Sequence, residues 1–487
     1  MNLKKFFSFI LFSAFTFSWS QEPPALDAIK KSDLKNDIFE LASDAMQGRR
    51  AGTINELRAA AWVAERAREA GMKPAGEDGT FFQFFPLYRT TVAEDSKITV
   101  DGKDLKLWKD VYEVSPVPVH FEETAVWLTP NDTTANLNNK VVAMKLLPPR
   151  KLPEEGMSLW VYRYALSAIR QQAATLKRQG AKAAILVADS TAYSKIGFFG
   201  HGLEEGKYEI DKKEWLKKQD ELPVFIVTPE FEEKLKKNVK VKADVTIDKF
   251  SYPSANVIAK VEGTDARLKD EYVLFSGHHD HDGVGVPVEG DSIWNGADDN
   301  ASVSVALLAI GRAWSKNPGK RSALFVWHGA EERGLFGSRY FVEHPVVKKE
   351  KINAVLNGDM IGRNESGNAA LLGSIPPHKN SSELVEMAMD ANEELTHFNV
   401  DTSWDAEDHP EFWYFRSDHL PYAQADIPAI FFTTLLHPDY HTPKDEPEKI
   451  DLEKLLEMTQ WMYATGWKVS QSGKAPALDK NDSNSEK

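Results

Sequence analysis

The sequence predicts an α/β protein with a mostly parallel sheet, helices on both faces, and a second, small α/β domain inserted into it. After residue 251 the chain carries short, almost continuously apolar strands: YVLFSG, ALFVWHG, NAVLNGD and PAIFFTT. Each is followed by a polar loop and a helical pattern, the order typical of a parallel sheet buried on both faces. A second strand–helix alternation, between about residues 111 and 246, lacks clustered acid and imidazole residues and predicts the insertion.

The remaining elements follow in chain order. Residues 37–71 show helical apolar spacing on both sides of GRRAGT, so two helices are expected there, and FFQFFPL is expected to be an edge strand or a loop. Within the insertion, KVVAMKLL, AKAAILVA and LPVFIV predict strands, and residues 158–179 predict a long helix. We therefore assign residues 111–246 to a non-catalytic insertion, which interrupts a main domain formed by 21–110 and 247–470.

The two ends of the chain are assigned separately. Lys4 and Lys5 precede an apolar run of roughly fourteen residues and then small residues, which predicts a signal peptide over residues 1–20 rather than a buried helix. Residues 471–487 are polar and predict a disordered tail. We expect export to a bacterial periplasm or the extracellular medium, with no stable membrane anchor after signal cleavage.

Composition narrows the classes of partner. The formal net charge of −14 argues against nucleic acid and anionic membranes, which select clustered Lys and Arg. The chain contains no cysteine, so disulfides and a lipid-bearing cysteine are excluded. Any metal in a site must then be held by His, Asp and Glu.

Acid and imidazole residues follow the predicted parallel strands. They are His278 after YVLFSG, Glu331 and Glu332 after ALFVWHGA, Asp359 at the end of NAVLNGD, and His441 after PAIFFTT. Because the carboxyl ends of parallel strands meet at one edge of a sheet, we expect these side chains to gather there.

Two further stretches belong to this group. In GADDNAS, one aspartate alone could be a helix N-cap, but Asp298 and Asp299 together exceed the need of one cap. In SGHHDHDGVG, strand alternation sends His278 and Asp280 to one face, where Asp280 can orient a metal-bound His278. His279 is expected to pack or hydrogen bond, and residues 281 and 282 to support the site or to be solvated.

The candidate ligands are enough for two metal ions. They are His278, His441, Asp299, Glu332 and Asp359, and if one carboxylate bridges, each ion receives one histidine and one further carboxylate. A position then remains for a shared water, as in a catalytic two-zinc site. Of the consecutive Glu331 and Glu332, one can bind metal while the other acts as general base. A surface charge pair is the alternative for these two glutamates.

Taken in order, HHD, GADDNAS, EERGLFGS, NGDMIGR and HPDYHTPKD resemble the co-catalytic two-zinc aminopeptidase family, which also contains glutamate carboxypeptidase II and the catalytically silent transferrin receptor. The resemblance runs from Asp37 to Trp467, and the insertion resembles a protease-associated domain. The sequence departs from the family at Val303, where glycine is usual, and a packing effect is expected.

The resemblance implies roles for individual residues. Asp299 would bridge two Zn²⁺ ions and be joined to Asn300 by a cis peptide bond. The remaining ligands would be His278 and Asp359 for one ion and Glu332 and His441 for the other. Glu331 would be the general base for the shared water, Asp280 the orienting carboxylate, Tyr440 a donor to the scissile carbonyl, and Arg416 a substrate contact.

The expected activity is that of a metallo-aminopeptidase, a hydrolase that removes N-terminal residues from peptides with a free N-terminus. Two alternatives stay open. One is a carboxypeptidase or amidase of the same clan, for which Arg416 would bind a carboxylate. The other is a non-catalytic binding protein that works through the insertion. The acidic and aromatic segment Asp401 to Phe415 is expected either to cover the site or to pack as a surface loop.

Overall fold

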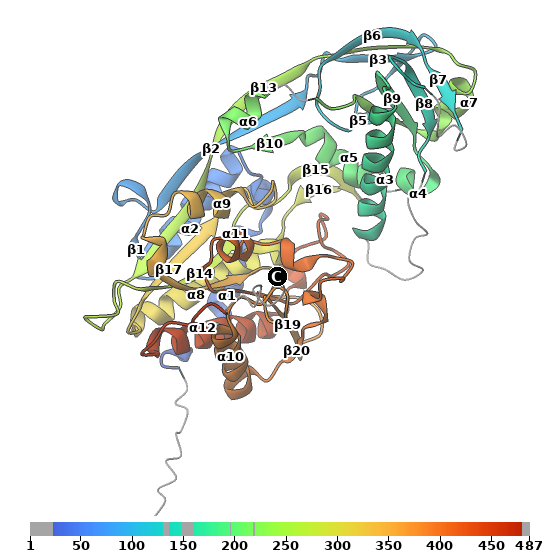
Figure 1. Cartoon of the computed structure of the whole chain (residues 1–487). Coiled ribbons are helices and arrows are strands. Elements are labelled where there is room, and N and C mark those ends of the chain that lie inside the picture. The colour runs from blue at the N-terminus through green and yellow to red at the C-terminus, as the bar shows by residue number, and fades with distance from the viewer. Residues whose placement is uncertain (1–22, 130–135, 148–158, 195, 218–219, 480–487) are drawn as a thin grey trace, which may run out of the picture.

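The computed structural model describes residues 23–129, 136–147, 159–194, 196–217 and 220–479 (Figure 1). The predicted signal peptide, residues 1–20, lies outside the described residues, as does the end of the predicted tail, 480–487. No helix in the described ranges is long and apolar enough to cross a lipid bilayer.

The largest sheet in the described part of the chain has ten strands, in the order β10-β2-β13-β17-β14-β18-β21-β19-β20, with β1 paired to β13. Its four middle strands run parallel and are the four predicted from the sequence: β17 (Ser322–His328), β14 (Tyr272–His278), β18 (Ile352–Gly358) and β21 (Ala429–Thr433). The others are β1 (Lys73–Pro74), β2 (Phe82–Val92), β10 (Lys207–Glu209), β13 (Ile247–Val261), β19 (Asn368–Leu372) and β20 (Asn399–Asp401). The predicted α/β class is confirmed. The sheet was predicted to be mostly parallel, and it is parallel at its centre, but β1, β2, β10 and β13 on one side and β19 on the other pair antiparallel, so the whole sheet is mixed.

Helices cover both faces of this sheet. One face buries alternate strand residues such as Phe275, Phe325 and Leu356 against a layer of helices. These helices are α1 (Lys31–Leu41), α2 (Ile54–Glu69), α8 (Val303–Lys316), α10 (Ser382–Ala391) and α12 (Leu452–Gln471). The opposite face buries Leu274 and Leu324 against α9 (Phe336–Glu343) and α11 (His419–Gln424). α1 and α2 are the two helices predicted on either side of GRRAGT.

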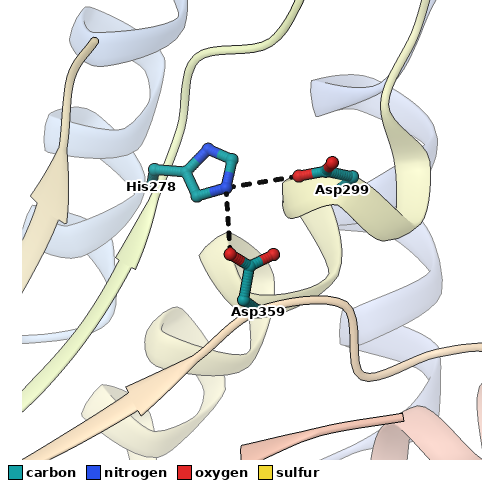
Figure 2. A group of neighbouring side chains, drawn as sticks. All are labelled: His278, Asp299 and Asp359. Carbon is teal, nitrogen blue, oxygen red and sulfur yellow. Dashed lines mark ion pairs between the residues drawn. The ribbon is translucent and has the colours of Figure 1, made fainter. Parts of the chain in front are cut away.

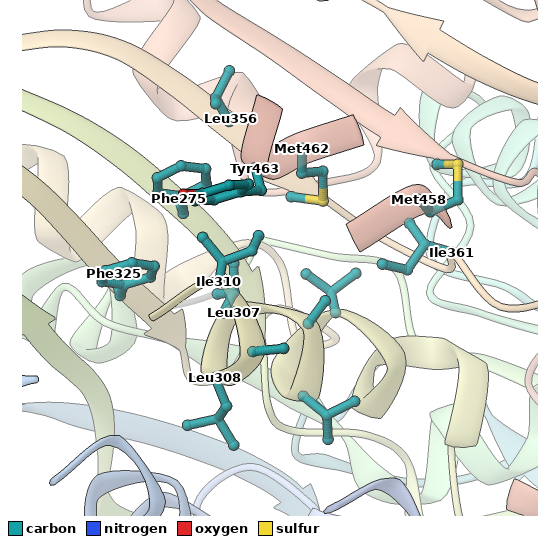
Figure 3. Packing of buried hydrophobic residues seen from close by; sticks show 14 of the residues in the cluster. Phe275, Leu307, Leu308, Ile310, Phe325, Leu356, Ile361, Met458, Met462 and Tyr463 are labelled. Atoms are coloured by element: carbon teal, nitrogen blue, oxygen red, sulfur yellow. The ribbon is translucent and has the colours of Figure 1, made fainter. Parts of the chain in front are cut away.

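The core is densest around α8, whose side chains lie between the sheet and α12 (Figure 3). This helix is apolar almost all round, which is the pattern of a helix buried on every side. Leu307 and Ile310 pack towards Phe275, and each fully buried aliphatic side chain of this kind contributes about 1.5–3 kcal/mol. The start of α8 is thereby held firmly beside the ends of β14 and β18.

Two smaller sheets form the unit at the upper right of Figure 1. The five-stranded sheet has the order β5 (Val111–Glu113), β11 (Val224–Val227), β9 (Ala183–Val187), β8 (Val141–Lys145) and β7 (Val126–Leu128). The four-stranded sheet has the order β4 (Lys103–Leu105), β3 (Lys97–Val100), β12 (Lys240–Val245) and β6 (Val119–Thr124). Apolar residues of both sheets share one buried cluster, and two strands, β3 and β4, precede residue 111.

Helices and short elements complete this unit. They are α3 (Leu159–Arg178), α4 (Ser190–Ser194), α5 (Ile196–Glu205), α6 (Lys212–Leu216) and α7 (Glu232–Leu235).

A hairpin of β15 (Gly283–Val288) and β16 (Asp291–Trp294) follows the HHDHD stretch in the main domain. The boundaries 111–246, and the assignment of the unit as a separate domain, stay predictions.

Two connections join this unit to the main sheet. The strands β2 and β13 pair along their length, from Phe82 with Val257 to Val92 with Ile247. β10 then adds to the outer side of β2 over residues 88–90, so residues 82–87 form an edge, as predicted for FFQFFPL.

At the other end of the chain, residues 472–479 of the predicted tail lie against the start of α10, where Ser381 Oγ donates to the carbonyl of Ala477 at 2.7 Å.

Candidate metal centre

The predicted site residues converge on one edge of the parallel sheet. His278 is the last residue of β14, Asp359 directly follows β18, and Glu331 lies three residues after the end of β17. Asp299 precedes α8, and His441 follows β21 by a loop. The strand ends and the start of α8 therefore bring together side chains that are up to 163 positions apart, the interval from residue 278 to residue 441.

The first group contains His278, Asp299 and Asp359 (Figure 2). His278 Nε2 lies 3.2 Å from Asp299 Oδ1 and 3.6 Å from Asp359 Oδ2. Ser417 Oγ donates to the same oxygen of Asp359 at 2.7 Å, which orients that carboxylate. The three side chains point at a common centre from three separate elements.

The second group contains His441, Asp299 and Glu332. His441 Nε2 lies 3.1 Å from Asp299 Oδ2 and 3.3 Å from Glu332 Oε2. Asp299 therefore turns one carboxylate oxygen to each histidine. This is the arrangement expected of a carboxylate shared by two metal ions.

The tautomers of both histidines suit metal binding. His278 Nδ1 donates to the carbonyl of Asp280 at 3.1 Å, and His441 Nδ1 donates to Asp282 Oδ2 at 2.9 Å. Each ring then presents the lone pair of Nε2, and both Nε2 atoms are buried without a hydrogen-bond partner among the described residues. These orphaned nitrogens, together with carboxylate oxygens and no sulfur, fit zinc.

The buried carboxylates of the site also favour the binding of a cation. Burial favours the neutral form of His278, but the charges of Glu331 and Asp359 outweigh it and raise the pKa of His278 well above its ordinary value. For Glu332, burial acts to raise the pKa, and the charge of His441 outweighs it and lowers the pKa to about 2. The carboxylates thus create a strongly negative field, which metal ions would neutralise.

Glu331 and Glu332 leave the backbone in different directions. Ala330, which has a left-handed conformation with φ 54°, turns the chain just before them. Glu331 Oε2 then lies 3.7 Å from His278 Nε2, whereas Glu332 faces His441. Burial raises the pKa of Glu331 well above its ordinary value. Glu331 is therefore a carboxylate with high proton affinity beside the first group.

Asp280 is fully buried and holds the backbone of the two glutamates. Its Oδ1 accepts from the N–H of Glu331 at 3.0 Å and its Oδ2 from the N–H of Glu332 at 3.4 Å. Asp280 Oδ1 is also 3.7 Å from His278 Nδ1, an ion-pair distance longer than a hydrogen bond. Asp280 thus orients the glutamates by hydrogen bonds and His278 chiefly through its own backbone carbonyl.

The rest of the HHDHD stretch is buried, so of the two roles expected for His281 and Asp282 the structure favours support of the site and excludes solvation. His281 Nδ1 donates to Glu332 Oε1 at 2.9 Å, and Asp282 accepts from His441. His279 packs with both ring nitrogens unpaired within the described chain, and burial lowers its pKa to about 3. These contacts depend on the fold of the β15–β16 hairpin, so residue spacing alone could not distinguish them.

Tyr440, Arg416 and Trp413 form a stacked group beside His441. Arg416 Nη2 donates to Tyr440 Oη at 2.9 Å, and its guanidinium lies 4.5 Å from the Trp413 ring centre. Burial raises the pKa of Tyr440, so the phenol keeps its proton. Trp413 belongs to the acidic and aromatic segment and is buried, while Phe412 and Phe415 of the same segment are 56% and 46% exposed. The segment therefore contacts Arg416 through Trp413 and through Glu411, whose Oε2 lies 3.5 Å from Arg416 Nη1.

Sequence reasoning missed two residues that shape the site. Asp445, in the motif HPDYHTPKD, accepts the backbone N–H groups of Asp298 and Asp299 at 3.0–3.1 Å. Arg49, in GRRAGT, is fully buried and donates to four backbone carbonyls, including that of His279 at 2.8 Å and that of Gly296 at 2.9 Å. A charged residue beside a glycine break was the only available signal for Arg49. The Asp299–Asn300 peptide bond is cis, as predicted.

Comparison with known proteins identifies this part of the chain. Residues 256–465 match the sequence profile of Peptidase family M28, and all five predicted ligands lie inside that range. This part of the chain is similar to peptidase family M28. The resemblance of the motifs to zinc aminopeptidases is thereby supported at the level of the family, and the matched range begins only after the predicted insertion, residues 111–246, has ended.

Curated relatives of this chain carry aminopeptidase names. Aminopeptidase YwaD of Bacillus subtilis is 28% identical over 189 residues, which are 37% of this chain and 39% of that protein. A probable leucine aminopeptidase of Arthroderma benhamiae is 26% identical over 223 residues, 43% of this chain and 55% of that protein. The chain thus spans about half or less of the length of these relatives.

A solved structure shows a likeness that extends over almost the whole chain. The structure of BSAP, a zinc aminopeptidase from Bacillus subtilis, is 19% identical with a TM-score of 0.60 and covers 94% of this chain and 99% of its own. The aminopeptidase from Aneurinibacillus sp. strain AM-1 has the same TM-score at 18% identity. At these identities the likeness establishes the fold.

Proposed function

We propose that the protein is an exported zinc-dependent aminopeptidase that hydrolyses the N-terminal residue from peptides. The observation that carries the proposal is Asp299, which offers one oxygen to each of two histidine–carboxylate groups while Glu331 lies beside them. The match of residues 256–465 to the M28 family and the aminopeptidase names of relatives support the same proposal.

In this proposal two zinc ions bind per chain. His278 and Asp359 would hold one, Glu332 and His441 would hold the other, and Asp299 would offer one carboxylate oxygen to each. When bound, zinc would supply Lewis acidity, which lowers the pKa of water and polarises a carbonyl group. The two ring nitrogens, already freed by hydrogen bonds on the opposite side of each imidazole, support this assignment.

Glu331 is the proposed general base and acid. Its buried carboxylate takes the proton of the attacking water and returns it to the amine that leaves when the peptide bond breaks. The N–H bond from Glu331 to Asp280 holds its backbone in place during this transfer. The raised pKa of Glu331 suits a group that must hold a proton between the two steps.

Tyr440 is the proposed donor to the carbonyl oxygen of the scissile bond. Because Arg416 donates to Tyr440 Oη, the phenolic hydrogen stays available for another acceptor. A donor aimed at the oxygen that gains negative charge stabilises the transition state. Arg416 thus assists the tyrosine, and its contact with substrate remains part of the proposal.

The site suits a free amino terminus better than a carboxylate. The buried carboxylates around the two groups attract the positive charge of an α-amine. Arg416, the candidate for a carboxylate pocket, already pairs with Glu411 at 3.5 Å and with Tyr440. These contacts favour the aminopeptidase over a carboxypeptidase.

A panel of substrates tests the proposal. The purified full chain would be assayed with aminoacyl anilides, with their N-acetylated forms and with peptides blocked at either end, and zinc would be measured on the same sample. We expect cleavage that requires a free α-amine, and about two zinc ions per chain. Preference for C-terminal cleavage would replace the proposal by a carboxypeptidase, and a zinc-loaded protein without any hydrolysis would support a binding protein.

Export has its own test. Lys4 and Lys5 followed by an apolar run support signal cleavage near Ser20. We expect the mature protein, recovered from the periplasm or the medium of a bacterial host, to begin near Gln21 in N-terminal sequencing. A full-length chain found only in the cytosol would contradict export.

A further inference from the structure

Arg333 connects the metal centre to the inserted unit. It directly follows Glu332, its Nη2 pairs with Asp282 Oδ1, and its Nη1 pairs with Glu205 Oε2 at the end of α5. The side chains of Arg333, Asp282 and Glu205 are only 9%, 10% and 2% exposed. Water therefore screens these pairs little, and their geometry matters more than that of surface ion pairs.

The two oxygens of Asp282 have separate partners. Oδ1 receives Arg333, and Oδ2 receives the Nδ1–H of His441 at 2.9 Å. The orientation of Asp282 thus decides whether His441 keeps the tautomer and ring angle that present Nε2 to a metal. Arg333 fixes that orientation from the opposite side.

Glu205 is held equally firmly. Its Oε1 lies 3.2 Å from Arg50 Nε, and its backbone carbonyl accepts from Arg89 Nε at 2.6 Å. The next residue, Gly206, has φ +82°, and a Cβ there would lie 2.2 Å from the carbonyl oxygen of Thr90. Only glycine allows this approach, which lets β10 pair with β2 and places Glu205 at the junction.

We propose that Glu205 of the inserted unit is a positioning residue for the metal centre. It acts through Arg333 and Asp282 to hold His441 in its metal-binding orientation. This inference rests on the proposed zinc site and extends it, because it makes metal affinity depend on a residue outside the part of the chain that matches the M28 family.

The direction of the effect follows from charge and geometry. Without the carboxylate of Glu205, the charge of Arg333 is no longer neutralised on that side, and a less neutralised cation near His441 opposes the binding of Zn²⁺. Arg333 is also free to turn both donors to Asp282 and draw it away from His441. Both effects weaken the ion held by His441 and leave the ion held by His278 nearly unchanged.

The test measures zinc affinity and needs no catalysis. Metal-free full-length protein would be titrated with Zn²⁺ against a chromophoric chelator, which resolves two binding constants. For Glu205→Gln we expect one constant to weaken by about 10-fold, the lower end of the effect of orienting partners on metal affinity. Glu204→Gln is the matched control, because Glu204 is an exposed neighbour on the same helix.

A double-mutant cycle shows whether Glu205 acts through Asp282. Asp282→Asn should weaken the same constant, and adding Glu205→Gln to it should have little further effect. Fully additive losses, or wild-type constants in a folded Glu205→Gln protein, would overturn the proposal. If Glu205→Gln does not fold, as judged by circular dichroism, Arg333→Lys carries the test, and wild-type constants in that folded variant would overturn it likewise.

The outcome is distinguishable from failure of the proposed function. A wild-type chain that binds no zinc would refute the zinc aminopeptidase. A wild-type chain that binds two zinc ions, with Glu205→Gln unchanged, would refute only the positioning role.

Discussion

Asp299 combines two demands on one residue: its side chain faces two histidines, and its backbone must stay still. The carboxylate of Asp445 meets the second demand by accepting the backbone N–H of Asp299 at 3.0 Å. Because Asp445 accepts this N–H group, the side-chain oxygens of Asp299 are not used for it and remain directed at His278 and His441. The proposed bridging ligand thus depends on a second, buried carboxylate 146 positions later in the chain.

Glu331→Gln tests whether Glu331 is the general base while Glu332 binds metal. Glutamine keeps the size of the side chain but cannot take a proton, so we expect both zinc ions to bind and turnover to fall by at least ~10²-fold. Metal analysis and steady-state rates check this on one sample. Glu343→Gln, an exposed change on α9, is the control. Near wild-type turnover in Glu331→Gln would remove Glu331 from its proposed role.

The burial of Glu113 leads to a prediction of how the free energy of unfolding depends on pH. It is buried in β5, its Oε2 has no partner within the described chain, and burial raises its pKa to about 8. An unfolded glutamate has a pKa of about 4.3, so between these values the folded chain binds a proton that the unfolded chain has released. The free energy of unfolding therefore falls as pH rises through this window, by an amount on the order of 2–5 kcal/mol.

Glu113→Gln should remove this loss, because a neutral amide does not titrate. Thermal unfolding should be followed from about pH 5 to about pH 9. We expect the variant to have a higher Tm than wild type above about pH 7, and its Tm to change less with pH. Glu94→Gln, at an exposed position, should follow the wild-type curve. A Glu113→Gln profile parallel to that of wild type would contradict the prediction.

At the scale of single residues, the sequence predicted those that follow apolar strands. His278 and Asp359 could be placed together because parallel strands end at one edge, and the structure brings them within 3.6 Å. Arg49 and Asp282 could not be placed, because their contacts arise from loops that meet only in three dimensions. Their roles, like those of the ligands, stay predictions until variants are measured.

At the scale of elements, the start of α8 is fitted against two strands. Val303, where the related family usually has glycine, is fully buried between Gly277, one residue before the end of β14, and Gly358, the last residue of β18. A Cβ at Gly277 would lie 2.5 Å from Val303 Cγ1, and one at Gly358 would lie 2.9 Å from it. The packing effect expected from the sequence is confirmed: valine fills the space that two strand glycines leave open.

This fit gives a prediction about paired substitutions. Gly277→Ala should destabilise the protein by about 1–3 kcal/mol through overpacking, and Val303→Ala by a similar amount through a cavity. The double variant lacks Cγ1 of residue 303, so the nearest atoms to the new Cβ at residue 277 are Cβ of residue 303 at 3.1 Å and Gly358 O at 3.2 Å. We therefore expect it to be more stable than the sum of the single changes implies, as measured by denaturant unfolding.

Gly367→Ala is the control for this pair, since a Cβ there meets no atom within 4 Å. Strict additivity of Gly277→Ala and Val303→Ala would show that α8 does not press on β14 as described. The result would also bear on the site, because Asp299 lies just before α8.

Long apolar elements were predictable and short ones were not. β14, β17, β18 and β21 were confirmed because buried parallel strands have an almost unbroken apolar pattern. β10 spans only Lys207–Glu209 and is not apolar, so no sequence pattern indicated it. It exists because the inserted unit lies against the edge of β2, a tertiary effect that local propensity does not contain.

At the scale of the whole molecule, metal binding should stabilise the native fold. The proposed ligands come from five separate segments, so the site cannot form in the unfolded chain, and zinc binds only the folded state. At a free zinc concentration about 100 times the Kd, each site adds about 2.7 kcal/mol to the free energy of unfolding.

Chelation should therefore lower the Tm, and added zinc should restore it, as measured by calorimetry on the full chain. Glu331→Gln should respond like wild type, because Glu331 is not a proposed ligand. Asp299→Asn should lose most of the response. An unchanged Tm on chelation of a zinc-loaded wild-type sample would contradict the assignment of the site.

The paired strands β2 and β13 have a consequence for how such a protein could arise. Val92 and Ile247 are directly opposite each other in the register, although 154 residues lie between them, from 93 to 246. If a two-residue turn took the place of those residues, β2 and β13 would form an ordinary hairpin at the edge of the sheet. A hairpin tip tolerates added sequence well. Such a shortened chain would keep all five proposed metal ligands and lack the carboxylate of Glu205.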